Sequence, residues 1–96
     1  MITDTNNNLQ NTLSKFWMFK NEKLLGTMME YYKNNIITVD LSNLQEEIWD
    51  GELRIKFNPN THAKMIMHLV ADIVTYTRPN DMSMVDDNMI EFWWDC

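Results

Sequence analysis

The stretch that decides the fold is NTHAKMIMHLVADIVTY, residues Asn60–Tyr76. Its apolar residues recur every three or four positions, the spacing that stacks side chains along one face of an α-helix. That face consists of Ile66, Leu69, Val70 and Ile73, widened by Met65, Met67 and Val74. The opposite side carries Lys64, His68, Asp72 and Thr75. A helix this apolar on one side needs a surface to cover, and the alternating segments before and after it predict a β-sheet.

Both ends of this predicted helix carry sequence signals. Residue types that accept hydrogen bonds from the first backbone N–H groups of a helix are present at Asn58, Asn60 and Thr61. Pro59 suits a first helical turn. At the other end, Pro79 disfavours the helical conformation for Arg78, so we expect the helix to end there.

The chain before this helix contains two further helical patterns. Residues 1–8 are polar and rich in asparagine, and we expect them to be frayed. The two apolar sets that follow are Leu9, Leu13, Phe16 and Trp17, and then Leu24, Leu25, Met28, Met29 and Tyr32. They do not align on one straight helix, so a kink or break is expected near Asn21. The sequence leaves open whether these residues form one bent helix or two helices. A strand over residues 15–19 is the alternative. Gly26, inside the second set, predicts a close contact between helices.

Three segments alternate between apolar and polar residues as half-buried strands do. They are residues 36–41, 52–57 and 89–95, with inward sets of Ile37, Val39 and Leu41, of Leu53, Ile55 and Phe57, and of Ile90, Phe92 and Trp94. A capping box at residues 42–45 predicts a short helical turn through Ile48. Residues 78–88 have the composition of a polar loop.

The order helix, helix, strand, strand, helix, strand indicates an α+β domain. We expect a small, mostly antiparallel sheet of about three strands with helices packed on one face. The last strand can return parallel to residues 52–57 through a right-handed crossover. A chain of 96 residues is too short for two independent cores, so residues 1–96 are expected to form a single domain.

The formal charge of −6 is distributed unevenly along the chain. Residues 1–33 contain four lysines and three acidic residues, residues 34–57 two basic and five acidic residues, and residues 58–96 two basic and six acidic residues. Direct binding to nucleic acid needs many basic side chains that neutralise phosphates, so it is not expected. An acidic surface suits a basic protein partner instead.

Sequence features also predict where the protein works. No apolar run is long enough to span a membrane, and the N-terminus lacks the basic start and apolar core of a secretory signal. The single cysteine, Cys96, excludes an internal disulfide. These features predict a cytoplasmic, intracellular protein without a membrane partner.

No cluster of residues predicts a reaction. His62 and His68 are six positions apart, so on one helix they point in different directions and do not share a metal ion. His68 and Asp72 are one turn apart, which suits a general base but more commonly forms a surface pair. The aspartates of residues 81–87 lack the glycine and glutamate of a calcium-binding loop. We therefore expect no enzymatic activity, no metal site and no cofactor.

The chain combines large apolar residues, among them flexible methionines, with many acidic residues. It has nine methionines and four tryptophans, residue types favoured where a surface grips a partner. The phase of the helices and strands predicts a core position for Trp17, Phe57, Phe92 and Trp94. Trp93 shares its strand face with Glu91 and Asp95, and Trp49 lies among acidic residues, so each is predicted to be a bulky anchor ringed by carboxylates. Alternatively, both pack against neighbouring elements or a second subunit. The predicted partner-binding residues are Glu46, Glu47, Trp49, Asp50, Glu52, Asp86, Asp87, Glu91, Trp93 and Asp95.

These features favour a small acidic inhibitor that occupies a basic surface on a partner protein. Its specific form is a nucleic-acid mimic that places carboxylates where phosphates would lie on a nuclease or a nucleic-acid-binding protein. Phage-encoded inhibitors of host or defence proteins and immunity proteins of nuclease toxins are analogies of function. A charge of −6 is modest for such a mimic. The alternatives are a structural or assembly module that acts as a homodimer, and an enzyme with a His68–Asp72 site.

Overall fold

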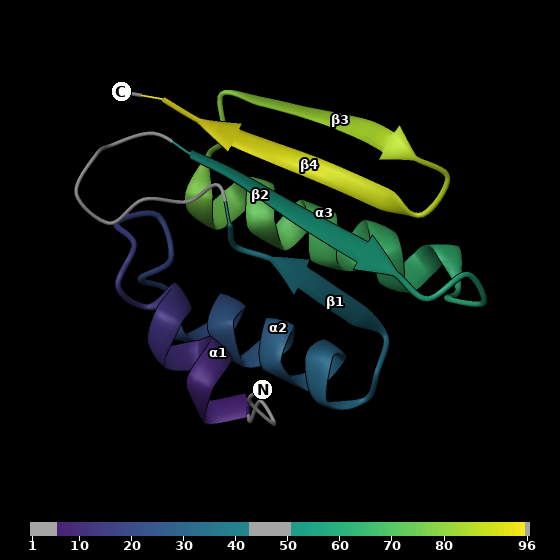
Figure 1. The fold of residues 1–96 in the computed structure, drawn as a ribbon, viewed down its shortest axis with the longest axis horizontal. Helices are drawn as coiled ribbons and strands as arrows, with labels where there is room; N and C mark the ends of the chain where they lie inside the picture. Colours follow the sequence, from purple (N-terminus) through teal and green to yellow (C-terminus); the bar gives the residue numbers. More distant parts are fainter. Residues whose placement is uncertain (1–5, 43–50, 96) are drawn as a thin grey trace.

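A computed structural model of the protein describes residues 6–42 and 51–95. They form three helices and a four-stranded antiparallel sheet (Figure 1). The elements are α1 (Asn6–Leu13), α2 (Glu22–Lys33), β1 (Ile37–Asp40), β2 (Gly51–Phe57), α3 (Ala63–Thr77), β3 (Asp81–Asp86) and β4 (Met89–Trp94). The predicted α+β class is confirmed, with four strands in place of about three.

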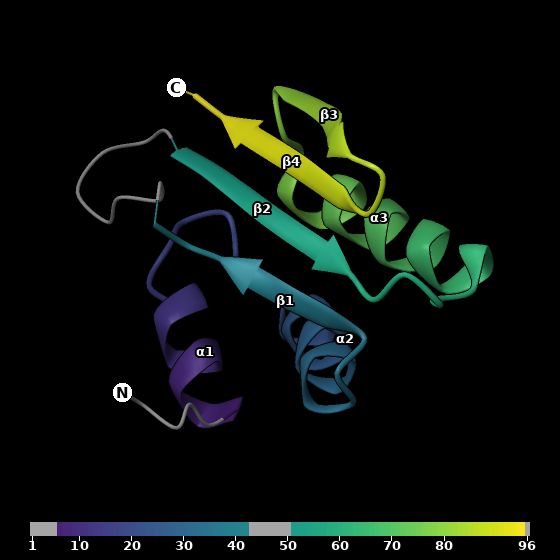
Figure 2. The same cartoon turned by 45° about the vertical axis from the view of Figure 1, so that its right-hand side comes forward.

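The sheet has helices on one face only among the described residues. Its strands are ordered β1-β2-β4-β3, and each neighbouring pair is antiparallel. α2 contacts β1 and α1 packs against α2, while α3 lies behind β2 and β4 in Figure 1 and passes behind β4 in Figure 2. The inward residues predicted for β2 and β4 are buried beneath this helical layer.

The predictions for residues 78–88 and for the last connection are wrong. The segment interpreted as a polar loop contains β3, whose six residues are all exposed. An edge strand that buries so little resembles a loop in composition. The last strand does not return parallel to β2, because β4 pairs with β2 in the antiparallel direction. β3 runs parallel to β2 and is separated from it by β4.

Trp94 packs in the core beneath β4, where it contacts other aromatic rings and α3. Its ring centroid lies 5.6 Å from that of Phe19 in an edge-to-face arrangement and 6.3 Å from that of Phe92. Its indole Nε1 donates a hydrogen bond to the Thr77 carbonyl at 3.0 Å. This bond ties the last strand to the last turn of α3. The predicted burial of Phe57, Phe92 and Trp94 is confirmed.

α3 is the predicted central helix with a different N-terminal cap. Leu69 and Ile73 on its inner face are fully buried. The cap is His62, whose Nδ1 accepts the Lys64 N–H at 3.1 Å, and not one of the three predicted capping residues. The predicted end is confirmed: Arg78 adopts a left-handed conformation with a φ of 50°.

The N-terminal helices α1 and α2 are separated by a compact connection, residues 14–21. Asn21 caps α2 by accepting the Leu24 N–H at 3.0 Å, so the predicted break near Asn21 is confirmed. The connection consists of turns and is neither a helix nor a strand; it buries Phe16, Met18 and Phe19. Trp17 is 41% exposed, so its predicted core position is wrong. The helical spacing behind that prediction does not apply beyond the end of α1.

Gly26 lies on the exposed side of α2. A Cβ at this position would meet no heavy atom within 4 Å, so the predicted close helix contact is wrong. The buried face of α2 consists instead of Leu24, Leu25, Met28, Met29 and Tyr31.

Candidate protein-binding surface

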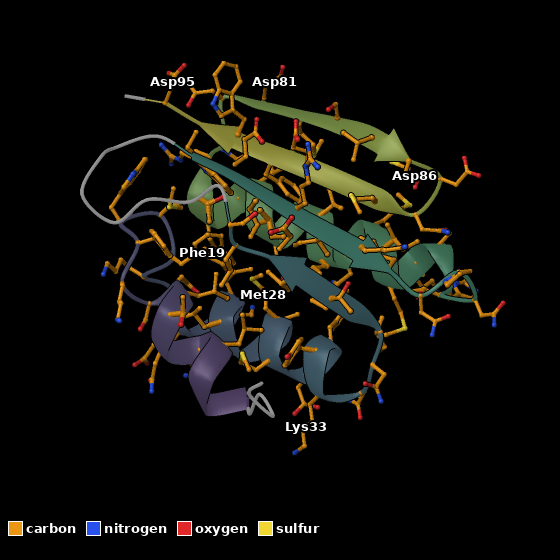
Figure 3. All side chains as sticks on the ribbon, viewed as in Figure 1. Phe19, Met28, Lys33, Asp81, Asp86 and Asp95 are labelled. Carbon is orange, nitrogen blue, oxygen red and sulfur yellow. The ribbon has the colours of Figure 1, made fainter. Side chains whose placement is uncertain are left out.

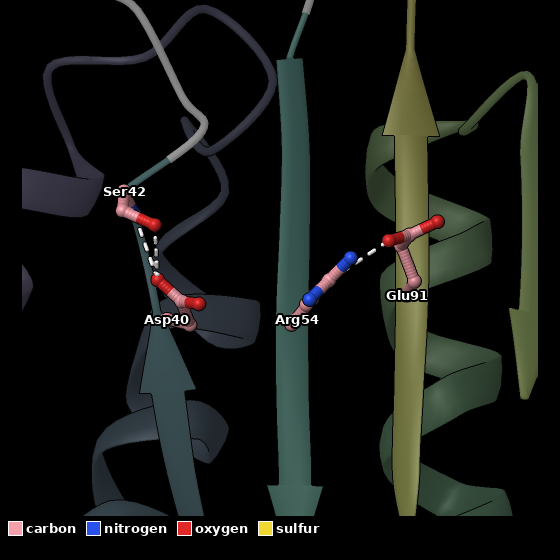
Figure 4. Close-up of polar contacts among 4 residues, drawn as sticks. All are labelled: Asp40, Ser42, Arg54 and Glu91. Atoms are coloured by element: carbon pink, nitrogen blue, oxygen red, sulfur yellow. Dashed lines mark hydrogen bonds and ion pairs between the residues drawn. The ribbon is translucent and has the colours of Figure 1, made fainter. Parts of the chain in front are cut away.

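A polar row crosses the helix-free face of the sheet. Asp40 of β1 lies beside Arg54 of β2 in the strand register. Arg54 in turn lies beside Glu91 of β4, which lies beside Ser83 of β3. Arg54 Nε donates to Glu91 Oε2 at 2.9 Å, and this carboxylate raises the pKa of Arg54 (Figure 4). Glu91 is therefore already engaged with a cation of its own sheet.

Asp40 is the last residue of this polar row and lies on β1, at the edge of the sheet. Its Oδ1 accepts hydrogen bonds from the Ser42 backbone N–H at 2.9 Å and from the Ser42 hydroxyl at 2.7 Å (Figure 4). These bonds lower the pKa of Asp40 because they favour the ionised carboxylate, and Arg54 acts in the same direction. Asp40 therefore remains negatively charged at neutral pH.

Trp93 is the large apolar side chain of the helix-free face. It is 43% exposed, although the adjacent Trp94 is fully buried. Its direct cross-strand neighbours are Glu52 on β2 and Asp81 on β3. Such neighbours have Cβ atoms about 4.5–5.5 Å apart, so a carboxylate residue flanks the indole on each side. The structure thus places Trp93 as the sequence predicted, on an exposed face beside acidic residues.

Two hydrogen bonds of Asn80 hold this end of the sheet in place. The Asn80 N–H donates to the Trp93 carbonyl at 2.7 Å, and the Asn80 side-chain Oδ1 accepts the Asp95 N–H at 2.8 Å. Asp81 and Asp95 consequently lie at the same end of the β3–β4 hairpin (Figure 3). We define the Trp93 cluster as Glu52, Asp81, Trp93 and Asp95.

The other predicted acidic residues of this hairpin lie at its far end. Asp86 and Asp87 are at the turn from β3 to β4, where Asp86 Oδ1 accepts the Asp87 N–H at 2.7 Å. Figure 3 shows Asp86 at the opposite end of β3 from Asp81. A strand of this length separates its ends by about 17 Å, so these residues do not belong to the Trp93 cluster.

Sequence reasoning missed Asp81 as a surface residue beside Trp93. The loop predicted for residues 78–88 gives Asp81 no cross-strand neighbour. The signal that could have identified β3 is the strict alternation of polar and apolar residues from Asp81 to Met84. The predicted binding residues Glu46, Glu47, Trp49 and Asp50 lie outside the described residues, as does the predicted helical turn after Ser42.

His68 and Asp72 lie one turn apart on α3. His68 Nε2 lies 3.6 Å from Asp72 Oδ2, which is too long for a hydrogen bond and is an ion pair only when the imidazole is protonated. Asp72 Oδ2 is buried without a hydrogen-bond partner among the described residues. The nearby Tyr31 hydroxyl donates instead to the Met65 carbonyl at 3.0 Å. Asp72 therefore accepts no hydrogen bond from His68 in this structure.

Within residues 6–42 and 51–95, no group of three or more His, Cys, Asp or Glu side chains is arranged to hold a metal ion. None of the described helices combines the length and apolarity required to cross a membrane. Comparison with protein-family models, curated proteins and solved structures gives no match.

Proposed function

We propose that the protein binds a basic surface of a partner protein through the Trp93 cluster and inhibits the partner by occupying that surface. The observation that carries the proposal is an exposed indole with a carboxylate residue on each neighbouring strand. Tryptophan is a frequent anchor of protein interfaces because its burial removes a large apolar area from water. Carboxylates around such an anchor select lysine and arginine on the opposing surface.

The charge around the cluster supports a basic partner. Residues 79–95, which include β3 and β4, contain five acidic residues and no lysine or arginine. The basic residues of the helix-free face are Arg54 and Lys56 of β2, and Arg54 is paired with Glu91. The resulting field attracts cations and repels phosphates.

A nuclease or a nucleic-acid-binding protein is the class of partner that we propose. Such a protein presents lysines and arginines that bind phosphates, and carboxylates can occupy the same positions. Binding then competes with nucleic acid. We place this encounter inside the cell, where the single cysteine of the chain remains reduced.

Capture of the partner tests the proposal. The immobilised protein is incubated with a nuclease-treated cell lysate and eluted with a salt gradient, and the eluted proteins are identified by mass spectrometry. We expect one stoichiometric basic protein, released at moderate salt because salt screens exposed charges. An empty capture, or a partner that is retained at high salt, contradicts the proposal.

Charge-neutralising variants connect the captured protein to the cluster. Asp81→Asn combined with Asp95→Asn removes two charges, and asparagine can still accept the Met82 N–H that Asp81 Oδ1 accepts at 2.8 Å. Glu22→Gln combined with Glu30→Gln is the matched control, because both residues are exposed on α2. Only the first variant is expected to slow association and reduce its salt dependence. Equal effects of the two variants would mean that net charge, and not the cluster, governs binding.

The alternative function is that of a homodimeric assembly module, and the exposed edge strand β3 is the observation that favours it. Pairing of two β3 strands is one way to cover exposed apolar residues such as Met84. Sedimentation velocity over a wide range of protein concentration separates the alternatives. A monomer at every concentration excludes the homodimer.

A further inference from the structure

β3 presents an open strand edge next to the Trp93 cluster, which includes Asp81 of this strand. It is the last strand of the sheet and pairs with β4 on one side only. No described strand lies beyond it, and all six of its residues are exposed. The outer edge of such a strand offers backbone N–H and C=O groups to any additional strand.

Two methionines of β3 extend the apolar face of the sheet beyond the helices. Met82 is paired with Phe92 and Met84 with Ile90, and both partners are buried on the helix-covered face. Residues paired across strands point to the same face. Met84 is nevertheless 61% exposed. The helical layer therefore does not cover the sheet as far as β3.

α3 has an exposed apolar flank at the same edge of the domain. Met67 is 70% exposed and Val74 is also exposed. Met67 follows Met65 by two positions, and Val74 follows Asp72 by two positions. Two positions correspond to about 200° around a helix. Met67 and Val74 therefore lie on the side of α3 opposite to Met65 and Asp72, which face α2. The side that faces α2 is identified by Tyr31 of α2, whose hydroxyl donates to the Met65 carbonyl and whose pKa is raised by burial and by the nearby Asp72. Because α2 packs near β1, the opposite flank of α3 faces the β3 side.

The other face of β3 is acidic. Asp81 and Ser83 point to the helix-free face, since they pair with Trp93 and Glu91. β3 therefore carries methionines on one face and an acidic environment on the other, and Asp86 adds a negative charge at its end.

We infer that β3 accepts an extended segment of the basic partner as an additional strand, and that lysine or arginine alternates with apolar residues in this segment. The inference rests on the proposed function, because the segment belongs to the same basic partner. Side chains of a strand alternate between the two faces of a sheet. The basic side chains meet Asp81 and the acidic face, while the apolar side chains cover Met82 and Met84 and extend towards α3.

Charge argues against a second copy of the chain as the occupant. Antiparallel pairing of β3 with its copy joins the two acidic faces, each with Asp81 and Asp86, into one surface. Like charges brought close together repel each other, and this repulsion destabilises the pair. A basic segment carries the opposite charge and is therefore attracted to the acidic residues of β3.

The test uses amide hydrogen exchange measured by NMR with a synthetic peptide. The probe is an alternating lysine–valine peptide of about six residues, the usual length of a strand. A peptide with the same composition but with its lysines and valines in separate blocks is the control. At about ten times the dissociation constant of the alternating peptide, exchange of alternate β3 amides should slow by about tenfold. The block peptide should not produce this protection.

A variant of the edge strand gives an independent check. Met84→Lys places a positive charge on an exposed residue of β3 and should abolish the protection, since it repels the lysine-containing peptide. Gln10→Lys adds the same charge at an exposed position on α1 and should leave the protection unchanged. Equal protection in Met84→Lys and Gln10→Lys overturns the inference.

The readouts separate this inference from the proposed function. If the Trp93 indole N–H resonance shifts on addition of peptide while β3 exchange stays fast, strand addition is wrong and the basic-surface proposal stands. If neither signal responds to this peptide or to the captured partner, both are wrong. If β3 becomes protected with rising protein concentration and no peptide, the occupant is a second copy and the inference is overturned.

Discussion

Trp93 and Trp94 are consecutive residues with opposite roles. Trp94 is fully buried, stacks near Phe92 and donates its indole N–H to the Thr77 carbonyl. Trp93 is exposed on the helix-free face. One position in a strand is enough to exchange core for surface, because side chains alternate between the two faces.

Alanine at each tryptophan should separate these roles. We expect Trp94→Ala to lower the free energy of unfolding by about 3–5 kcal/mol, through the cavity and the orphaned Thr77 carbonyl. Trp93→Ala should cost about 1 kcal/mol or less, because its indole is half exposed already. Urea denaturation of both variants checks this. A loss of cooperative unfolding in Trp93→Ala would place Trp93 in the core.

Gly26 offers a stabilising substitution. Gly26→Ala should raise the free energy of unfolding by about 0.5–1 kcal/mol, because glycine is a poor helix former and the new Cβ meets no neighbour. Thermal unfolding measures the effect. The reciprocal control is Ala71→Gly at an exposed position of α3, which should lower the stability by a similar amount. A lower melting temperature for Gly26→Ala would contradict the open surroundings of this residue.

Tyr31 should make the stability depend on alkaline pH. Burial raises its pKa, and the nearby Asp72 raises it further. The folded state therefore favours the neutral phenol, so the contribution of Tyr31 is complete below the unfolded pKa of about 10 and is lost as pH rises through the higher folded pKa.

Tyr31→Phe isolates this contribution. At neutral pH we expect the variant to be less stable by about 1 kcal/mol, because it loses the hydrogen bond to the Met65 carbonyl. The difference from the wild type should shrink above about pH 10. Urea denaturation over a pH series measures it. A difference that stays constant or grows with pH would contradict the raised pKa of Tyr31.

At the scale of elements, the central helix and three of the strands could be predicted from the sequence. α3, β1, β2 and β4 combine a strong apolar period with clear breaks, so local patterning and tertiary packing agree. β3 was not predicted, because an edge strand is defined by its pairing with β4 and buries almost nothing of its own. The connection after α1 was misjudged because turns, and not helical spacing, bury Phe16 and Phe19.

The N-terminal cap of α3 is the element-scale prediction. His62→Ala should lower the free energy of unfolding by about 0.5–2 kcal/mol, since it removes the acceptor of the Lys64 N–H. His62→Asn should retain most of this stability, because asparagine is a good capping residue. Urea denaturation compares the two variants. If His62→Ala is as stable as the wild type, another residue caps the helix.

At the scale of the whole molecule, the domain has a helix-covered face and an acidic helix-free face. Composition predicted the excess of acid, and strand alternation predicted the exposure of Trp93. The neighbours Glu52 and Asp81 could not be derived in the same way. They come from two different strands, and only the register of β2 and β3 against β4 brings them to Trp93.

The central claim is that Trp93 anchors a basic partner, and its most direct test is the affinity of two tryptophan variants for the captured protein. Trp93→Ala removes the anchor, and Trp17→Ala removes a tryptophan of similar exposure from the connection between α1 and α2. Surface plasmon resonance should show that Trp93→Ala weakens binding by about tenfold or more, mainly through faster dissociation. Trp17→Ala should bind like the wild type. Equal affinities of Trp93→Ala and the wild type would contradict the account.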